Sequence, residues 1–227
     1  MIISHKHKFI FVKTKKTAGT SVEIALSKYC GEEDVITPVV AEDEAKRTQY
    51  GYRGPQNYRI PLRTLSGKEL AKRLIFRDHL EFYNHISADY IRRHIDPSIW
   101  NSYYKFCFER NPWDKAVSWY YWISRKGPQP SLAEFIQSAQ VSNVSDFELY
   151  TKNSEMLVDK VFKYEDLESA LNEISDLIGL GEPLRIPRTK VNSSKTKLDY
   201  KELLSEREID RISKVFAREI AYLGYEF

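Results

Sequence analysis

The chain has 227 residues, of which 42% are hydrophobic and 30% are charged. This composition excludes low-complexity disorder, collagen and disulfide scaffolds, and the length favours one large domain over residues 1–227 rather than two. Thirty-five basic residues against 32 acidic ones leave a net charge of +3, which is too small to favour a protein that coats nucleic acid.

Cysteine content and hydropathy indicate the compartment. Cys30 and Cys107 are too few for a disulfide framework, and Cys107 lies between two phenylalanines in an apolar run. A reduced, cytoplasmic location is therefore expected. Lys and His interrupt the first twelve residues, which do not match a signal peptide, and no stretch approaches the roughly 18 apolar residues that span a membrane.

Three apolar segments predict buried strands, at residues 8–14, 105–110 and 158–164. A helix signal follows each of them: a capping pattern, an Asn-Pro pair at residues 111–112, and apolar residues at helical spacing. Strands that alternate with helices predict an α/β fold, with a central parallel sheet of about four or five strands flanked by helices.

Four capping boxes, in which Ser or Thr precedes Glu by three residues, are expected to open helices. The last of these helices should end at Gly224, a residue type typical of helix C-termini. The four pairs are Thr20–Glu23, Ser66–Glu69, Ser131–Glu134 and Ser205–Glu208.

The segment of about residues 36–64 lacks a periodic pattern, which predicts a lid or a binding loop inserted in the domain. Its part over residues 47–63 interleaves arginines with tyrosines, a combination that could bind an anionic sugar polymer or single-stranded nucleic acid. The alternative is a loop whose arginines face water or pair with the acidic residues 42–44. The residues concerned are Arg47, Arg53, Arg59, Arg63, Tyr50, Tyr52 and Tyr58.

The first candidate site is the turn after the first predicted strand. Small residues there let successive backbone N–H groups converge, and the following helix adds the positive end of its dipole. With a lysine and hydroxyls beside them, these groups indicate a site for a phosphate-like anion. The order differs from the Walker loop, in which the lysine follows the glycine. The alternative is an ordinary turn in which Gly19 provides only backbone freedom. The turn comprises Lys16, Thr17, Ala18, Gly19, Thr20 and Ser21.

The second candidate site follows the second predicted strand. Arg110 ends that strand, and Ser118 lies about two helical turns later on the face that also carries Asp114. A guanidinium and a hydroxyl at the carboxyl end of a parallel strand suit a phosphate in the crevice of the sheet. The alternative for Arg110 is a structural ion pair. The nearby tryptophans are interpreted as packing residues: Trp113, Trp119 and Trp122.

Five segments together resemble the bacterial branch of the family-2 sulfotransferases, relatives of the Golgi carbohydrate sulfotransferases. They are KKTAGTSVE, NHISA, FERNPWDKAVSWYYW, KYEDL and the closing LGYEF. The specific feature is KTAGTS followed later by RNPWDKAVS. The resemblance implies a domain similar in outline to the P-loop kinases, and a sulfate donor, 3′-phosphoadenosine 5′-phosphosulfate.

The resemblance also implies which residues bind the donor. Residues 16–21 would hold its 5′-phosphosulfate, whereas Arg110 and Ser118 would hold its 3′-phosphate. Similar enzymes usually have Pro in place of Lys15 and Arg in place of Lys115. The first difference adds positive charge beside the donor and leaves the shape of the loop open.

A general base is expected near His85, because similar enzymes place one in the segment FYNHISA. Glu81, Asp78 and His79 are rival bases. The histidine spacings match no zinc pattern, and sulfuryl transfer needs no bound metal to bridge the donor, so no metal site is expected. A later basic loop offers Lys195 or Lys197 as a further phosphate contact, or simply as solvated charges.

The resulting expectation is a sulfotransferase in which Lys16 and His85 act in catalysis and the acceptor is a hydroxyl, with a saccharide favoured. No nucleic-acid partner is expected. Two other classes stay open: a nucleotide kinase or NTPase, which would require ATP and magnesium, and a non-catalytic binder of polyanions, which would show steep salt dependence without turnover.

Overall fold

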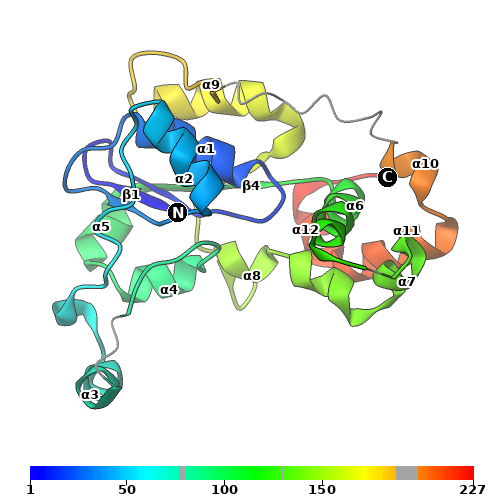
Figure 1. Cartoon of the computed structure of the whole chain (residues 1–227), viewed down its shortest axis with the longest axis horizontal. Coiled ribbons are helices and arrows are strands. Elements are labelled where there is room, and N and C mark those ends of the chain that lie inside the picture. Colours follow the sequence, from blue (N-terminus) through cyan, green and yellow to red (C-terminus); the bar gives the residue numbers. More distant parts are fainter. Residues whose placement is uncertain (77–79, 129, 188–198) are drawn as a thin grey trace.

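The computed structural model describes residues 1–76, 80–128, 130–187 and 199–227, and a five-stranded sheet lies at its centre (Figure 1). The strands follow the order β3-β1-β2-β4-β7 across the sheet. A separate two-stranded hairpin joins β5 (Thr151–Lys152) to β6 (Glu155–Met156). The sheet strands are β1 (Ile2–Ser4), β2 (Phe9–Phe11), β3 (Val35–Ile36), β4 (Tyr104–Glu109) and β7 (Lys160–Lys163).

The sheet is mostly parallel. β4 pairs in parallel with β2, where Phe9 lies opposite Tyr104, and with β7, where Phe106 lies opposite Lys160. β1 is antiparallel to its neighbours β2 and β3. The predicted α/β fold is therefore confirmed. The three predicted strands form, whereas β1 and β3 went unpredicted because three and two residues are too few to show alternation.

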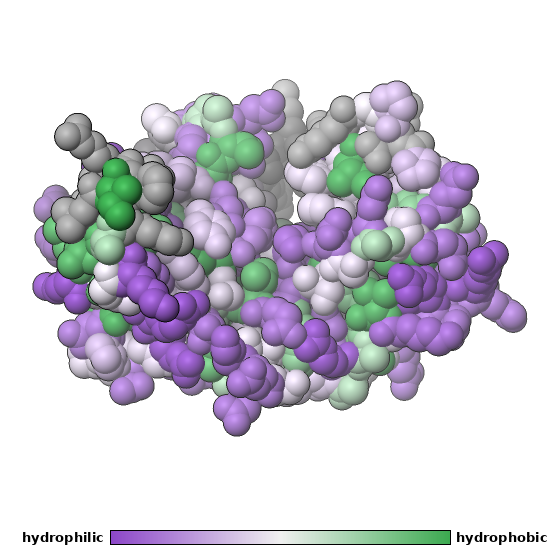
Figure 2. All heavy atoms as spheres, turned by 90° about the horizontal axis from the view of Figure 1, so that it is seen from below, coloured by the Kyte–Doolittle hydropathy of each residue, from purple (hydrophilic) through white to green (hydrophobic). Residues whose placement is uncertain are grey.

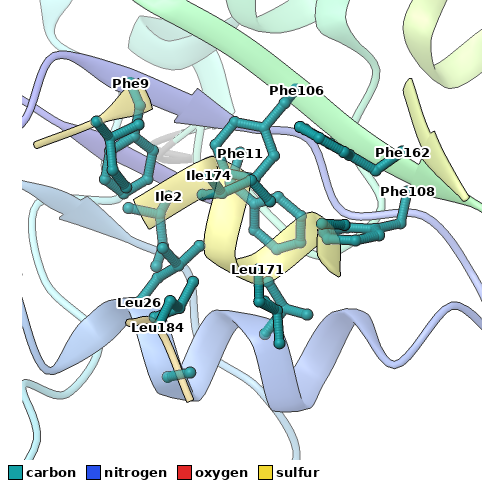
Figure 3. Packing of buried hydrophobic residues seen from close by; sticks show 14 of the residues in the cluster. Ile2, Phe9, Phe11, Leu26, Phe106, Phe108, Phe162, Leu171, Ile174 and Leu184 are labelled. Carbon is teal, nitrogen blue, oxygen red and sulfur yellow. The ribbon is translucent and has the colours of Figure 1, made fainter. Parts of the chain in front are cut away.

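Side chains that alternate along β2 and β4 divide the core between the two faces of the sheet. Phenylalanines point to one face, which α1 (Gly19–Ser27) and α9 (Leu167–Leu177) cover (Figures 1 and 3). Burying each such side chain stabilises the fold by about 1.5–3 kcal/mol. The cluster includes Phe9, Phe11, Phe106 and Phe108 from the strands and Leu26, Leu171 and Ile174 from the helices.

The opposite face is covered by α4 (Ala88–Arg93), α5 (Pro97–Ser102) and α8 (Phe147–Tyr150) (Figure 1). The strand residues between the phenylalanines, such as Ile10 and Cys107, point to this side. Both cysteines are buried free thiols. Because β2 and β4 are parallel, their carboxyl ends lie at the same edge of the sheet, where Arg110 contacts the loop that follows β2.

A third cluster of helices follows β4. Asn111 caps α6 as predicted, because its side-chain oxygen accepts hydrogen bonds from the N–H groups of Trp113 and Asp114. The prediction of a single helix at the C-terminus is wrong. This segment forms two helices that are separated at the buried Phe216, whose φ and ψ of −105° and 24° lie outside the helical range. Gly224, with φ 61°, ends the second helix as predicted. The cluster comprises α6 (Pro112–Ile123), α7 (Leu132–Gln137), α10 (Tyr200–Leu203), α11 (Glu206–Val215) and α12 (Ala217–Leu223).

The segment 36–64 is not irregular throughout, contrary to prediction. It contains α2 (Ala41–Gln49), whose first turn carries three acidic residues that favour a helix N-terminus. α3 (Gly67–Phe76) comes next and projects from the body in Figure 1. The capping boxes predicted at residues 66, 131 and 205 are confirmed. Short 3-10 helices complete the fold at Leu62–Thr64, Ser124–Lys126, Ala139–Val144 and Tyr164–Asp166.

The face seen in Figure 2 is mainly hydrophilic, and its hydrophobic side chains lie in small separate groups. In the part of the chain that the structure describes, none of the helices has both the length and the apolar character needed to cross a membrane.

Candidate functional site

A cavity of about 350 Å³ lies where the loop after β2 turns into α1. Cavities at the carboxyl ends of strands are the usual ligand sites of open α/β sheets. Four segments line it: residues 13–21, the start of α2, the pair Asn84 and His85, and α6. Of the predicted site residues, the cavity wall includes Lys16, Ala18, Gly19, Thr20, Ser21 and His85.

The loop 13–18 takes an unusual backbone path. Lys16 and Ala18 have φ values of 61° and 57°, in the left-handed region that non-glycine residues rarely adopt. Ala18 is the N-cap of α1, so the first N–H groups of this helix have no partner within it. Thr17 is fully buried, its hydroxyl contacts that of Thr14, and it is not part of the cavity wall.

The capping box predicted at Thr20–Glu23 is wrong. Thr20 already lies inside the helix, and Glu23 turns into the protein, where its carboxylate is 2.8 Å from Nζ of Lys13 and 3.5 Å from Nη2 of Arg47. Burial would raise the pKa of Glu23, but the surrounding cations lower it overall, so this carboxylate stays ionised. Thr20 itself lines the cavity.

Gly19 has no room for a side chain. A Cβ at this position would lie 2.9 Å from Cγ of Lys13, which is buried and held by its ion pair, and 3.1 Å from the carbonyl oxygen of Thr14. Gly19→Ala is expected to lower the free energy of unfolding in urea by about 1–3 kcal/mol. Gly67→Ala is the matched control, because Gly67 also begins a helix but has open space around it. Equal stability of the two variants would contradict the crowding at Gly19.

Arg110 joins the two predicted motifs. Its Nη1 donates to the carbonyl oxygen of Lys16 at 2.9 Å and to Oγ of Ser118 at 3.3 Å. Its Nε donates to Asp114 at 2.8 Å, and the guanidinium lies 4.5 Å from the ring centre of Tyr164. The ion pair that the alternative interpretation predicted is therefore present. The same guanidinium lies beside Ser118, and neither residue is part of the cavity wall.

His85 faces the cavity from the segment before α4. Its φ is 58°, and its Nδ1 lies 3.1 Å from the carbonyl oxygen of Lys13. A carbonyl can only accept, so Nδ1 carries the proton and the lone pair is on Nε2. Burial, followed by the charge of Lys13, lowers the pKa of His85 to about 4. The imidazole is thus neutral at pH 7.

Two of the rival bases, Asp78 and His79, lie outside the described residues, as do Lys195 and Lys197. Glu81 is described; its carboxylate is 3.6 Å from Nε of Arg59 and does not line the cavity. The cavity wall contains one carboxylate that the sequence did not indicate, Asp43 of α2, which accepts a hydrogen bond from Lys46 at 2.6 Å.

The arginine-rich stretch is largely structural in the part nearest the site. Arg47, expected in a binding loop, is fully buried on α2 between Glu23 and Glu44. Arg53 donates to the carbonyl oxygen of Cys30. The pair of Arg47 with Glu44 follows the alternative interpretation, in which the arginines pair with residues 42–44, whereas the contact of Arg53 with Cys30 was not predicted.

Tryptophans contribute more to the cavity than predicted. Trp113 is a packing residue, and its Nε1 donates to the carbonyl oxygen of Ile209. Trp119 and Trp122, however, line the cavity as a stacked pair with ring centres 4.8 Å apart. The ammonium group of Lys16 lies 5.8 Å from the ring centre of Trp122. Their spacing of three on one helix could have indicated a shared face.

The loop has an N–H contact that proline could not provide. Lys15, which stands where similar enzymes usually have proline, donates its backbone N–H to Asp146 at 2.6 Å. Lys115, in place of their arginine, is fully buried and contacts the same carboxylate.

Within the described ranges, no group of three or more His, Cys, Asp or Glu side chains is arranged to hold a metal ion.

Two comparisons with known proteins gave matches. A model of the sulfotransferase family matches residues 1–226. The chain is also 36% identical over 101 residues to an uncharacterised protein of Archaeoglobus fulgidus, an alignment that covers 42% of this chain and 84% of that protein. The relative is uncharacterised, so its similarity adds no activity to the family match.

Proposed function

Because the chain belongs to the sulfotransferase family, we propose that it transfers a sulfuryl group from 3′-phosphoadenosine 5′-phosphosulfate to a hydroxyl of a carbohydrate. One observation carries the choice of donor: Arg110, beside Ser118, contacts the carbonyl of Lys16 in the other anion-binding loop. Two adjacent anion sites suit a nucleotide that carries a phosphosulfate and a separate phosphate on one ribose.

The phosphosulfate would bind at the start of α1. There the backbone N–H groups of residues 16–21, the hydroxyls of Thr20 and Ser21, and the helix dipole all favour an anion. The ammonium group of Lys16 faces the same cavity. The residues present thus fit the group by charge and by donor type.

The 3′-phosphate would bind to Arg110 and Ser118. Arg110 is only 5% exposed and is oriented by Asp114, so its guanidinium is held in place before a ligand arrives. A pre-positioned guanidinium loses little side-chain entropy on binding. Its hydrogen bond to Ser118 would be shared with the phosphate oxygens.

His85 would accept the proton of the acceptor hydroxyl at Nε2 while the hydroxyl oxygen bonds to sulfur. The bond from sulfur to the bridging oxygen breaks on the opposite side, and Lys16 offsets the charge that develops on that oxygen. The loop N–H groups hold the sulfuryl oxygens in line. Positioning and charge stabilisation supply most of the catalysis, as in phosphoryl transfer.

The choice of a carbohydrate rests on the remaining walls of the cavity. Trp119 and Trp122 offer flat apolar surface, and Asn84 and Asp43 offer polar groups nearby. A sugar ring has an apolar face and a polar rim, so this combination suits it.

Binding of the product nucleotide tests the proposal. Adenosine 3′,5′-bisphosphate at about 100 times its Kd is expected to add about 2.7 kcal/mol of stability, which raises Tm by roughly 5–10 °C. AMP, which lacks the 3′-phosphate, should give a much smaller shift. Arg110→Ala should remove this difference, because the lost charge-assisted hydrogen bond is worth about 1.5–3 kcal/mol.

Arg59→Ala is the control for lost charge, because Arg59 is exposed and outside the cavity wall. It should bind the bisphosphate as wild type does. A shift with ATP and magnesium but none with the bisphosphate would overturn the proposal in favour of a kinase or NTPase.

A further inference from the structure

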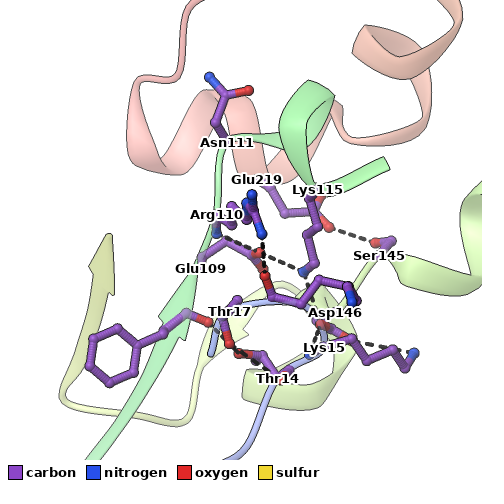
Figure 4. A network of polar contacts seen from close by, with 12 residues as sticks. Thr14, Lys15, Thr17, Glu109, Arg110, Asn111, Lys115, Ser145, Asp146 and Glu219 are labelled. Carbon is purple, nitrogen blue, oxygen red and sulfur yellow. Dashed lines mark hydrogen bonds and ion pairs between the residues drawn. The ribbon is translucent and has the colours of Figure 1, made fainter. Parts of the chain in front are cut away.

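Three buried charged side chains lie next to the loop 13–18 (Figure 4). Glu109 ends β4, Lys115 belongs to α6, and Asp146 precedes α8; each is at most 1% exposed. Nζ of Lys115 lies 2.5 Å from Oε1 of Glu109 and 2.8 Å from Oδ2 of Asp146. None of the three lines the cavity.

This cluster reaches the loop on both sides of the Lys16 α-carbon. Oδ2 of Asp146 accepts the backbone N–H of Lys15 at 2.6 Å. Oε1 of Glu109 accepts the backbone N–H of Arg110 at 2.9 Å, and the Arg110 side chain donates to the carbonyl oxygen of Lys16 at 2.9 Å. The N–H of Lys15 and the C=O of Lys16 are therefore both hydrogen-bonded to side chains that are connected through this cluster.

The held segment includes a strained residue. Lys16 has φ 61°, and left-handed conformations of non-glycine residues persist only where their surroundings impose them. The hydrogen bonds to Asp146 and Arg110 lie on either side of this φ angle. The loop alone would relax toward a more ordinary conformation.

Lys115 is the charge that lets the two carboxylates coexist. Burial alone would lower the pKa of Lys115, but Asp146 and Glu109 raise it overall, so it stays an ammonium. Burial raises the pKa of Glu109, and the ammonium group of Lys115 opposes this shift. The hydroxyl of Tyr150 also donates to Glu109, and Nζ of Lys15 lies 3.3 Å from Oδ1 of Asp146. Without Lys115, two buried carboxylates would face each other with Lys15 as the remaining nearby ammonium.

We propose that Lys115 and Asp146 are positioning residues, which hold the Lys15–Lys16 backbone in the conformation that sulfuryl transfer requires. The inference rests on the proposed function for its effect on turnover, but the conformation of the loop can be measured independently. Neither residue lines the cavity. Loss of Lys115 lets the Asp146 carboxylate turn toward Nζ of Lys15, and the N–H of Lys15 then loses its acceptor.

Lys115→Met removes the charge at similar volume, and Lys115→Arg keeps it. In Lys115→Met, kcat at saturating donor is expected to fall by about 100-fold, the effect of displacing a reacting group by about 1 Å. Hydrogen exchange of the loop amides should become faster in the same variant. Lys115→Arg should recover most of both properties. If Lys115→Met does not fold, Glu109→Gln/Lys115→Met removes one carboxylate with the ammonium and takes its place.

Asp34→Asn is the matched control. Asp34 is a buried carboxylate that also accepts backbone N–H groups, from His5 and Gly31, at the opposite end of β2. The Asp34→Asn variant should be less stable than wild type, with unchanged kcat and unchanged hydrogen exchange of the amides in the loop 13–18. The inference is overturned if folded Lys115→Met keeps wild-type kcat and loop exchange, or if Asp34→Asn lowers kcat equally. A wild type that neither binds the bisphosphate nor transfers sulfate contradicts the proposed function instead, and the exchange of the loop amides still decides the positioning role.

Discussion

His85→Ala is expected to lower kcat by about 10²–10⁴-fold, the usual contribution of a general base. Adenosine 3′,5′-bisphosphate should still bind with nearly wild-type affinity, because the hydrogen bond of His85 is to Lys13, which belongs to neither proposed anion site. Single-turnover transfer of labelled sulfate measures the first quantity, and calorimetry measures the second. His94→Gln is the control, because His94 is a buried histidine bonded to Tyr90 and Glu69 outside the cavity wall.

The pH dependence of the reaction tests the role of Nε2 of His85 as the base. Because the pKa of His85 is lowered to about 4 in the free protein, its Nε2 is a free base at pH values above that pKa. The value of kcat/KM, which reports groups of the free enzyme, should therefore be flat from about pH 6 to 8 and fall only in more acidic solution, whereas a histidine of ordinary pKa would lose half its base near pH 6.5. Full activity of His85→Ala would contradict this role and direct attention to Asp43, the carboxylate in the same cavity.

The sequence predicted the parts of the fold that have local signals. Phe9 to Val12 and Phe106 to Phe108 are continuous apolar runs, as expected for central strands buried on both faces. β1 and β3 are too short for such a signal, and they form because neighbouring strands supply their hydrogen-bond partners. α2 was missed since it is almost entirely polar, with one buried residue, Arg47.

The candidate site divides in the same way. Residues 16–21 and the pair Arg110 and Ser118 lie in contiguous segments, so their residue types alone indicated anion binding. The contacts of Glu23 could not be predicted: a Glu three residues after Thr is a capping signal, but here it pairs with Lys13 and Arg47. Such pairing between distant residues depends on the tertiary fold and overrides the local signal.

The residues that support the loop are the least predictable. Asp146 is 131 positions from Lys15 along the chain, and nothing in its neighbourhood differs from an ordinary polar turn. Trp113, Trp119 and Trp122 all belong to α6, and their residue type does not show which of them line the cavity. Only the tertiary structure shows that Trp119 and Trp122 do so, whereas Trp113 packs in the core. The proposed site therefore depends on contacts between residues more than 70 positions apart, such as that between His85 and Lys13.

Lys16→Ala is expected to lower kcat by about 10²–10³-fold, as for the loss of one group that stabilises developing charge. Alanine keeps the β-carbon, so the left-handed backbone at this position bears the same strain and only the ammonium and its stem are lost. Affinity for the bisphosphate should change by less than about tenfold, because the loop N–H groups and Arg110 remain. Lys28→Ala is the control: it removes a lysine outside the cavity wall whose ammonium is bound to Glu182. If instead Lys16→Ala weakens nucleotide binding strongly and leaves kcat unchanged, Lys16 contributes equally to the bound donor and to the transition state, and its role is binding rather than charge stabilisation during transfer.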